Sequence, residues 1–158
     1  MSAFRRLTHG QSSRRGSVAL EFAMASTPLM AVVFGFVAVM GVFNMMTSMQ
    51  SNAQYAARMM STGQITKNAS GTISSSNSSS STTCSSSMTS TQVEYYACNG
   101  LPSWATYTVT TAENCGTPSV TVGLSTSAST AAIADLLAIF TGKTITQQVV
   151  LMKEGTCP

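Results

Sequence analysis

Hydrophobic residues dominate the first part of the chain. Residues 22–43, FAMASTPLMAVVFGFVAVMGVF, contain no charged side chain. At a rise of about 1.5 Å per residue, a helix of this length reaches about 33 Å, which is enough to cross the hydrocarbon core of a bilayer. The run is apolar on all sides and leaves no face for solvent. The pattern therefore predicts a transmembrane helix, and the alternative is a buried helix of a soluble protein.

Beyond this run the apolar residues repeat at spacings of three and four, as they do along one face of a helix. They form a seam of Val39, Val42, Met46, Met49, Ala53, Ala56 and Met60. Gly63 is the expected stop. We predict one helix over residues 17–62, about 69 Å long, with a transmembrane and assembly part at 17–46 and an amphipathic extension at 47–63. We expect the protein's own globular part to cover the seam at 46–60 and partner helices to meet residues 17–43.

The second half of the chain changes from serine-rich to strand-like. Residues 64–91 form the next segment, and 68–91 are dominated by Ser and Thr, which predicts a long exposed loop. Residues 92–158 then contain four stretches rich in Val, Ile, Thr and aromatic residues, which predict strands at 92–97, 104–111, 119–124 and 144–152. Turns are expected at 99–102 and 113–118, and a short helix or apolar loop at 129–140. The expected fold is α+β, with the long helix packed on a small antiparallel sheet.

All four cysteines follow the apolar run, which fits disulfides in an oxidising compartment. Four cysteines allow three pairings. If strands 119–124 and 144–152 are antiparallel neighbours, Cys115 comes near Cys157, and Cys84 then pairs with Cys98. A zinc site is the competing interpretation, but the spacings do not favour it and the lone His9 lies near the N-terminus. We expect no metal and no cofactor.

The positive charges are concentrated at the N-terminus. Arg5, Arg6, Arg14 and Arg15 supply four of the eight basic residues, and removal of residues 1–16 leaves four basic and five acidic residues. No clustered basic face remains for nucleic acid. Arginines beside an apolar span stay in the cytoplasm, which places everything beyond residue 46 outside. The scattered acids and the serines without a histidine base predict a protein that is not an enzyme.

The sequence RRGSVALEF at residues 14–22 places arginines, Gly16, four residues and then Glu21 directly before the apolar run. A prepilin leader has this arrangement, and it is cut before the hydrophobic part, here after Gly16, whereas an ordinary signal peptide is cut after it. An ionised Glu21 at the edge of hydrocarbon costs several kcal/mol unless it is paired. The amine that cleavage exposes on Ser17 of a neighbouring subunit supplies a partner. The alternative is that Glu21 lies at headgroup level beside Arg14 and Arg15.

Small residues along the apolar run would let another helix approach closely, although they are common in membrane helices; they are Ala31, Gly35, Ala38 and Gly41. Pro28 lies inside the run and removes one backbone hydrogen bond. The candidate processing residues are therefore Gly16, Ser17, Glu21 and Phe22, and the candidate assembly residues are Ser17, Glu21, Pro28, Gly35 and Gly41.

These features resemble the TadE-like pseudopilins, minor pilins of the tight-adherence (Tad) branch of type IV pilus systems. The resemblance rests on residues 14–22 and on the polar, alanine-rich stretch QSNAQYAARMM at 50–60, continues broadly through 119–152, and covers about half of the chain. The serine-rich loop is peculiar to this chain. A major pilin is disfavoured because such Tad subunits are usually much smaller.

The resemblance implies a pilin-like fold and cleavage after Gly16 by a membrane aspartic prepilin peptidase. It also implies a place in the bacterial inner membrane with the C-terminal domain in the periplasm, or in the extracellular pilus. The implied partners are other Tad pilins or pseudopilins and the inner-membrane assembly platform, and the implied role is surface adherence. The alternative from another class is an uncleaved single-pass anchor that presents an extracytoplasmic binding or adhesive domain.

Overall fold

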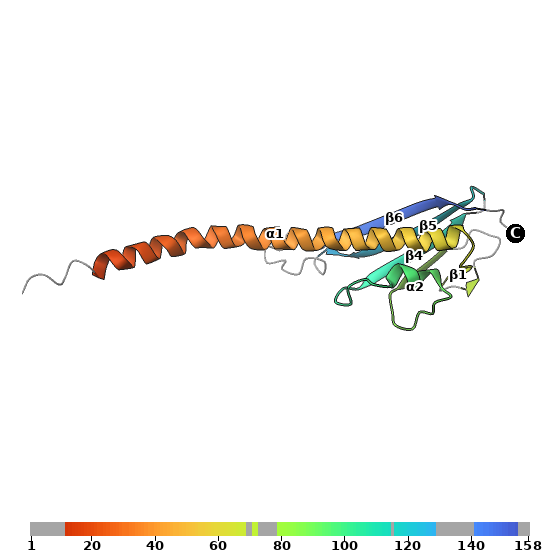
Figure 1. Cartoon of the computed structure of the whole chain (residues 1–158), viewed down its shortest axis with the longest axis horizontal. Helices are drawn as coiled ribbons and strands as arrows, with labels where there is room; N and C mark the ends of the chain where they lie inside the picture. Colours follow the sequence, from red (N-terminus) through yellow and green to blue (C-terminus); the bar gives the residue numbers. More distant parts are fainter. Residues whose placement is uncertain (1–11, 69–70, 73–78, 115, 129–140, 155–158) are drawn as a thin grey trace, which may run out of the picture.

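The longest element of the fold is a single helix, α1, which spans Ser12–Ser61. The computed structural model describes residues 12–68, 71–72, 79–114, 116–128 and 141–154. Figure 1 shows α1 projecting far beyond a small C-terminal head, which packs along its C-terminal half. Its 50 residues correspond to about 75 Å of helix. The prediction of one long helix is confirmed, with a start at Ser12 instead of residue 17.

The end of α1 is fixed by backbone hydrogen bonds around a glycine. Gly63 has a φ of 68°, a left-handed conformation that glycine adopts without steric cost. Its N–H donates to the Met60 carbonyl at 3.2 Å, and the Ile65 N–H donates to the Met59 carbonyl at 3.2 Å. These bonds satisfy carbonyls that the last turn of a helix leaves open. The predicted stop at Gly63 is therefore confirmed.

The head contains a four-stranded antiparallel sheet in the order β3-β4-β5-β6. The strands are β3 (Ser79–Thr83), β4 (Tyr107–Asn114), β5 (Ser119–Ser127) and β6 (Thr144–Met152). In the register, Val122 lies between Thr111 of β4 and Val149 of β6. A separate two-stranded ladder joins β1 (Lys67–Asn68) and β2 (Gly71–Thr72). The α+β layout is confirmed, and β6 has the predicted bounds.

Two predicted elements are wrong. The strand expected at 92–97 is a helix, α2 (Val93–Cys98), whose buried residues Val93, Glu94 and Ala97 share one helical face. The aromatic pair Tyr95-Tyr96 raised the strand propensity, but packing against α1 decides the conformation. The loop expected at 68–91 contains β3, because the run SSSTT pairs along its whole length with β4.

The other expectations for the head are met in part. The strand expected at 104–111 begins and ends three residues later, as β4. The strand expected at 119–124 is longer and reaches Ser127 as β5. The helix or apolar loop expected at 129–140 lies outside the described residues.

The core lies between α1, α2 and one face of the sheet. Its residues come from the second half of α1, from α2 and from β4, β5 and β6, and they include Met45, Met49, Ala53, Ala56, Ala57, Met60, Val93, Ala97, Val109, Val120, Val122, Leu124 and Ile145. Alanines on α1 let the other elements approach its backbone closely. The head therefore covers the part of the seam at residues 46–60, as expected. The covered part of α1 begins slightly earlier than the predicted residue 46, since Met45 is buried and Val42 packs against the core, whereas Val39 is 41% exposed.

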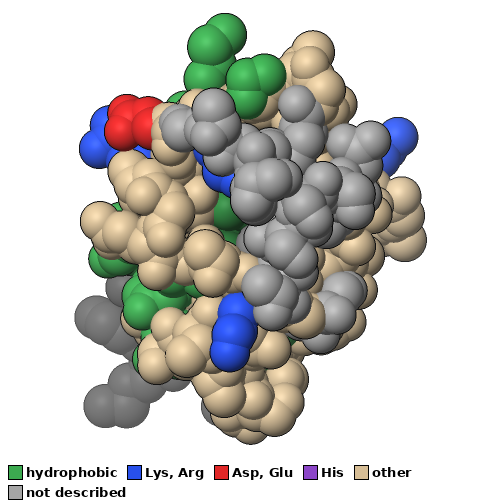
Figure 2. Space-filling model, turned by 90° about the vertical axis from the view of Figure 1, so that its right-hand side faces the viewer, with side chains coloured by type: hydrophobic (Ala, Val, Ile, Leu, Met, Phe, Trp, Pro, Cys, Tyr) green, Lys and Arg blue, Asp and Glu red, His purple; other side chains and the backbone are tan. Residues whose placement is uncertain are grey.

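Charged side chains are sparse on the head. Figure 2 shows the end of the head that lies opposite the projecting helix, where most of the described surface is neither charged nor hydrophobic. Scattered basic and acidic side chains interrupt this surface. Lys153 and the buried Glu113 form an ion pair that links the end of β6 to β4. The described surface thus offers neutral hydrogen-bonding groups in place of a strong electrostatic field.

Candidate functional site

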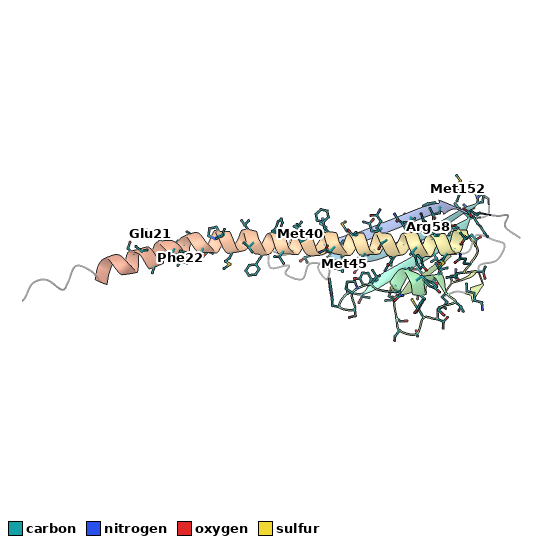
Figure 3. All side chains as sticks on the ribbon, viewed as in Figure 1. Glu21, Phe22, Met40, Met45, Arg58 and Met152 are labelled. Atoms are coloured by element: carbon teal, nitrogen blue, oxygen red, sulfur yellow. A yellow bond between two sulfur atoms is a disulfide. The ribbon has the colours of Figure 1, made fainter. Side chains whose placement is uncertain are left out.

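The projecting half of α1 exposes large hydrophobic side chains on every side. Consecutive residues of a helix point about 100° apart, yet Val32, Val33 and Phe34 are all exposed, as are Phe36 and Val37. Figure 3 shows side chains projecting from more than one side of the helix between Phe22 and Met40. By length and composition α1 could cross a membrane. A helix that is apolar all round needs an environment that covers all of its faces.

The head leaves a length of helix exposed that matches a bilayer. Between residues 17 and 37, every residue is exposed except Ser26 and Gly35, which are half-buried. Ala38 is buried, and Val42 and Met45 begin the contact with the core. Residues 17–37 span about 31 Å, close to the thickness of about 30 Å of a hydrocarbon core.

Two hydroxyl side chains in this part of α1 donate hydrogen bonds to the helix's own backbone. The hydroxyls of Ser26 and Thr27 both donate to the Ala23 carbonyl at 3.0 Å. Such bonds remove the need for water around a hydroxyl in an apolar environment. Pro28 lies within the helix, which continues through it, and Figure 1 shows only a gentle bend in the N-terminal third.

The residues that we predicted for processing lie at the start of this apolar half. Gly16 and Ser17 are both inside α1, and Ser17, Glu21 and Phe22 are exposed. Positions 17 and 21 are four residues apart and therefore share one side of the helix, one turn apart. Glu21 forms no ion pair with any side chain that the structure describes. Figure 3 shows Glu21 and Phe22 far from the head.

The other predicted site residues are more widely separated. Arg5 and Arg6 lie outside the described residues, and Arg14 and Arg15 belong to the first turns of α1. Gly35 and Gly41 are half-buried, and a Cβ atom added at Gly35 would meet nothing within 4 Å. The space beside Gly35 is thus open to another helix or to lipid.

Three contacts hold the head at a fixed place on α1. The side-chain amide of Asn52 donates to the Asn99 carbonyl at 2.7 Å. The rings of Tyr55 and Tyr96 pack with centroids 5.9 Å apart. At the far end, the Glu154 N–H donates to the Ser61 carbonyl at 3.0 Å. These contacts could not be predicted from the hydrophobic pattern, because Asn52 and Tyr55 lie beside the apolar seam.

A disulfide joins Cys84 to Cys98 with a Cα–Cα distance of 5.7 Å. Cys84 directly follows β3 and Cys98 ends α2, so the bond ties the edge of the sheet to the small helix. The predicted pair is confirmed. Cys115 and Cys157 lie outside the described residues, but the premise for their pairing holds: β5 and β6 are antiparallel neighbours, and the Lys153 N–H donates to the Pro118 carbonyl at 3.0 Å.

Buried polar groups in the head were not predicted from the sequence. The hydroxyl of Thr111 donates to the fully buried carboxylate of Glu94 at 3.2 Å, which links β4 to α2 through the core. The Tyr107 side chain is also buried, and its hydroxyl has no hydrogen-bond partner in the described part of the chain. Burial raises the pKa of Tyr107 because the phenolate loses its solvation.

In the ranges that the structure describes, no group of three or more His, Cys, Asp or Glu side chains could hold a metal ion. Comparison with models of protein families, with curated proteins and with solved structures found no match. The surface with the clearest demand for a partner is therefore the exposed apolar half of α1 and the motif at its start.

Proposed function

We propose that the chain is a TadE-like pseudopilin, a minor pilin of a Tad-type pilus. A prepilin peptidase removes residues 1–16, and Ser17 becomes the N-terminus. The projecting half of α1 lies in the bacterial inner membrane, with the head in the periplasm, and later enters the filament. There the protein contributes to pilus assembly and surface adherence, together with other Tad pilins or pseudopilins and the inner-membrane assembly platform. In this role it is a structural protein and not an enzyme.

The division of α1 into two halves is the observation that carries this proposal. The C-terminal half contributes residues to the core of the head. The N-terminal half contains the RRGSVALEF sequence at residues 14–22, which resembles the end of a prepilin leader, and beyond it exposes apolar side chains on all sides. Because the head covers little of residues 17–37, this segment can exchange lipid for neighbouring helices while the head stays folded. A filament subunit that is drawn from a membrane needs this property.

Glu21 gives the helices a reason to adopt one axial position. In a bundle of such helices the carboxylate is surrounded by apolar side chains, where an unpaired charge costs several kcal/mol. The amine of Ser17 on an adjacent subunit neutralises it after cleavage. A buried polar pair of this kind can fix the register of a helical assembly.

Processing is tested first, on full-length protein in a host with a competent prepilin peptidase. Intact-mass and N-terminal analysis of the membrane fraction should find Ser17 as the first residue. The matched control is the same chain in a strain without the peptidase, where the leader stays attached. Functional protein that retains its leader in the competent host would overturn the proposal.

The role of Glu21 is tested with Glu21→Gln, which removes the charge and keeps the shape. We expect normal insertion and cleavage, but a loss of several-fold in the amount recovered with sheared fibres. Glu154→Gln, at an exposed carboxylate in the head, should leave that amount unchanged. Equal incorporation of the two variants would show that the carboxylate of Glu21 sets no register.

One observation favours an uncleaved membrane anchor that presents a binding or adhesive domain. The bond between Gly16 and Ser17 lies within α1, which begins at Ser12. A helical peptide bond must unwind before a peptidase can cleave it, although the first turn of a helix frays readily. The N-terminal analysis separates this alternative from the pilin, because an anchor keeps residues 1–16.

A further inference from the structure

The four-stranded sheet ends in two strands that have one sheet neighbour each. In the described part of the chain β6 pairs with β5 and β3 pairs with β4. Both strands therefore carry a row of backbone N–H and C=O groups on the side away from the sheet. Such an edge is a template for pairing with another strand.

β6 is unusually open for an edge strand. It has nine residues, and its side chains are exposed or half-buried except that of Ile145. Val150 and Met152 are 58% and 85% exposed, and Figure 3 shows Met152 at the far end of β6, away from α1. Soluble proteins usually protect an edge with an internal lysine, a proline or a bulge. The sequence TITQQVVLM has no charge and no proline, and its pairing with β5 is continuous.

The opposite edge offers a complementary strand. β3 has the sequence SSSTT, again without charge or proline, and Ser79, Ser81 and Thr83 are exposed. Among the described elements its packing is mainly against β4. Its small hydroxyl side chains present no bulk or charge that would keep a second strand away.

The strand directions decide which edges can join. Because each neighbouring pair in the sheet is antiparallel, β3 and β6 run in opposite directions. In Figure 1 the strands lie along α1, so copies with parallel α1 helices also have parallel sheets. Between two such copies, pairing of β6 with β6 or of β3 with β3 would be parallel. Pairing of β6 with β3 is antiparallel and therefore extends the existing antiparallel sheet. Parallel pairing is the less stable of the two per residue.

We propose that β6 of one copy of this chain pairs with β3 of the next copy, so that neighbouring heads share a continuous antiparallel sheet. The inference rests on the proposed function, since a filament aligns the α1 helices in parallel. The contact joins two different surfaces of the same chain. A contact of this kind generates a ring where the rotation between copies closes and an open filament where it does not.

The register within the sheet indicates which residues meet. Ser81 pairs with Thr110, Thr110 with Gly123 and Gly123 with Gln148, so Ser81 and Gln148 mark the two ends of one row across the sheet. If neighbouring copies lie at the same height, Gln148 meets Ser81 of the next copy. An axial offset shifts this pairing by whole residues along the strand, and Gln148 still meets β3 (Ser79–Thr83) for offsets of up to two residues.

The test is photo-crosslinking in full-length protein in its native envelope. The photoreactive residue p-benzoylphenylalanine replaces Gln148, which is exposed on β6, or, as a matched control, Gln54, which is exposed on α1. We expect a covalent dimer from position 148, with the new bond mapped by mass spectrometry to residues 79–83 of the second copy. Position 54 should give no bond to that segment.

A second variant tests the receiving strand. Ser81→Lys places a charge on the edge, and in the chain with the crosslinker at 148 it should lower the yield of dimer to that of the Gln54 control. Ser119→Lys lies on the same outer face but on the central strand β5, and it should leave the yield unchanged. Titration of free thiols before and after reduction shows whether each variant keeps its disulfides and is folded.

The outcomes separate the two proposals. Removal of the leader together with bonds from position 148 to another protein, to a different segment or to nothing would overturn the edge pairing and leave the pilin proposal standing. A retained leader with bonds to residues 79–83 would overturn the pilin proposal and leave the edge pairing. Equal dimer yields in Ser81→Lys and Ser119→Lys would also count against the edge pairing.

Discussion

At the scale of single residues, Tyr107 stands out because its hydroxyl is buried without a hydrogen-bond partner among the described residues. In the unfolded chain this hydroxyl bonds to water, so folding costs the free energy of desolvation, about 1–3 kcal/mol for a group of this type. The ring lies in the core at the start of β4, where its apolar surface stabilises the head. The ring and the hydroxyl therefore have opposite effects on the free energy of unfolding.

Tyr107→Phe should therefore raise the free energy of unfolding by about 1 kcal/mol, measured by urea denaturation at pH 7. Because the pKa of Tyr107 is raised in the folded protein, the unfolded chain releases its phenolic proton first as the pH rises. Ionisation of Tyr107 therefore leaves the free energy of unfolding unchanged below about pH 10 and lowers it as the pH rises towards the folded pKa. Stability of the parent should fall in this range more steeply than that of Tyr107→Phe.

The control for this experiment is Tyr55→Phe, since Tyr55 is 51% exposed on α1. This variant should match the parent at pH 7 and keep the parent's loss of stability in alkali. A lower free energy of unfolding in Tyr107→Phe would contradict this prediction and mean that the hydroxyl forms a stabilising contact in the folded protein.

At the scale of elements, the disulfide is the covalent link between β3 and α2. The sequence separation of Cys84 and Cys98 is 14, and closing a loop of about this length in the unfolded chain stabilises the folded state by about 3 kcal/mol. Both elements are short and β3 is at the edge of the sheet. They therefore depend on this link more than the central strands do.

The double variant Cys84→Ser with Cys98→Ser should lose about 2–4 kcal/mol of stability. Hydrogen exchange should show the loss first in β3 and α2, while β5 stays protected because it lies between β4 and β6. The matched control for this local effect is Cys115→Ser with Cys157→Ser, which keeps the bond between Cys84 and Cys98. Uniform loss of protection across the sheet would show that the disulfide supports the whole head and not one edge.

Elements with a strong pattern of their own could be predicted from the sequence, and those that depend on a partner could not. Residues 144–152 combine strand formers with clear turns at both ends, and β6 has these bounds. β3 consists only of Ser and Thr, so its strand depends on pairing with β4. The helix α2 has six residues, too few for a pattern to outweigh two tyrosines with high strand propensity.

In the candidate site, too, features with a local sequence pattern could be predicted and contacts between distant residues could not. The sequence located Gly16, Glu21 and the apolar run because their spacing along the chain is itself the signal. It also indicated which half of α1 faces the head, since the seam repeats with helical spacing. The contacts that hold the head join residues far apart in the sequence, and Asn52 and Asn99, for example, are 47 positions apart. No local pattern indicates a pair at that separation.

At the scale of the whole molecule, the free energy of membrane insertion depends on the projecting half of α1 alone. Residues 22–43 contain ten Leu, Val and Phe residues, which at about 0.3–0.6 kcal/mol each favour insertion by roughly 3–6 kcal/mol. A lysine near the middle of the helix opposes insertion by about 2.5–3.5 kcal/mol. Two lysines in this segment should therefore cancel the preference for the membrane.

The double variant Val33→Lys with Val37→Lys should be released from the membrane pellet into the supernatant by alkaline carbonate. Both side chains are exposed on the projecting helix, and no described element of the head covers them. The matched control is Gln50→Lys with Gln54→Lys, which has the same spacing on exposed positions beside the head and should stay in the pellet. Both variants should keep the disulfide between Cys84 and Cys98, since neither changes the core. If the first variant resisted extraction, protein and not lipid would cover this helix, and the projecting half of α1 would have to be assigned to a stable complex before assembly.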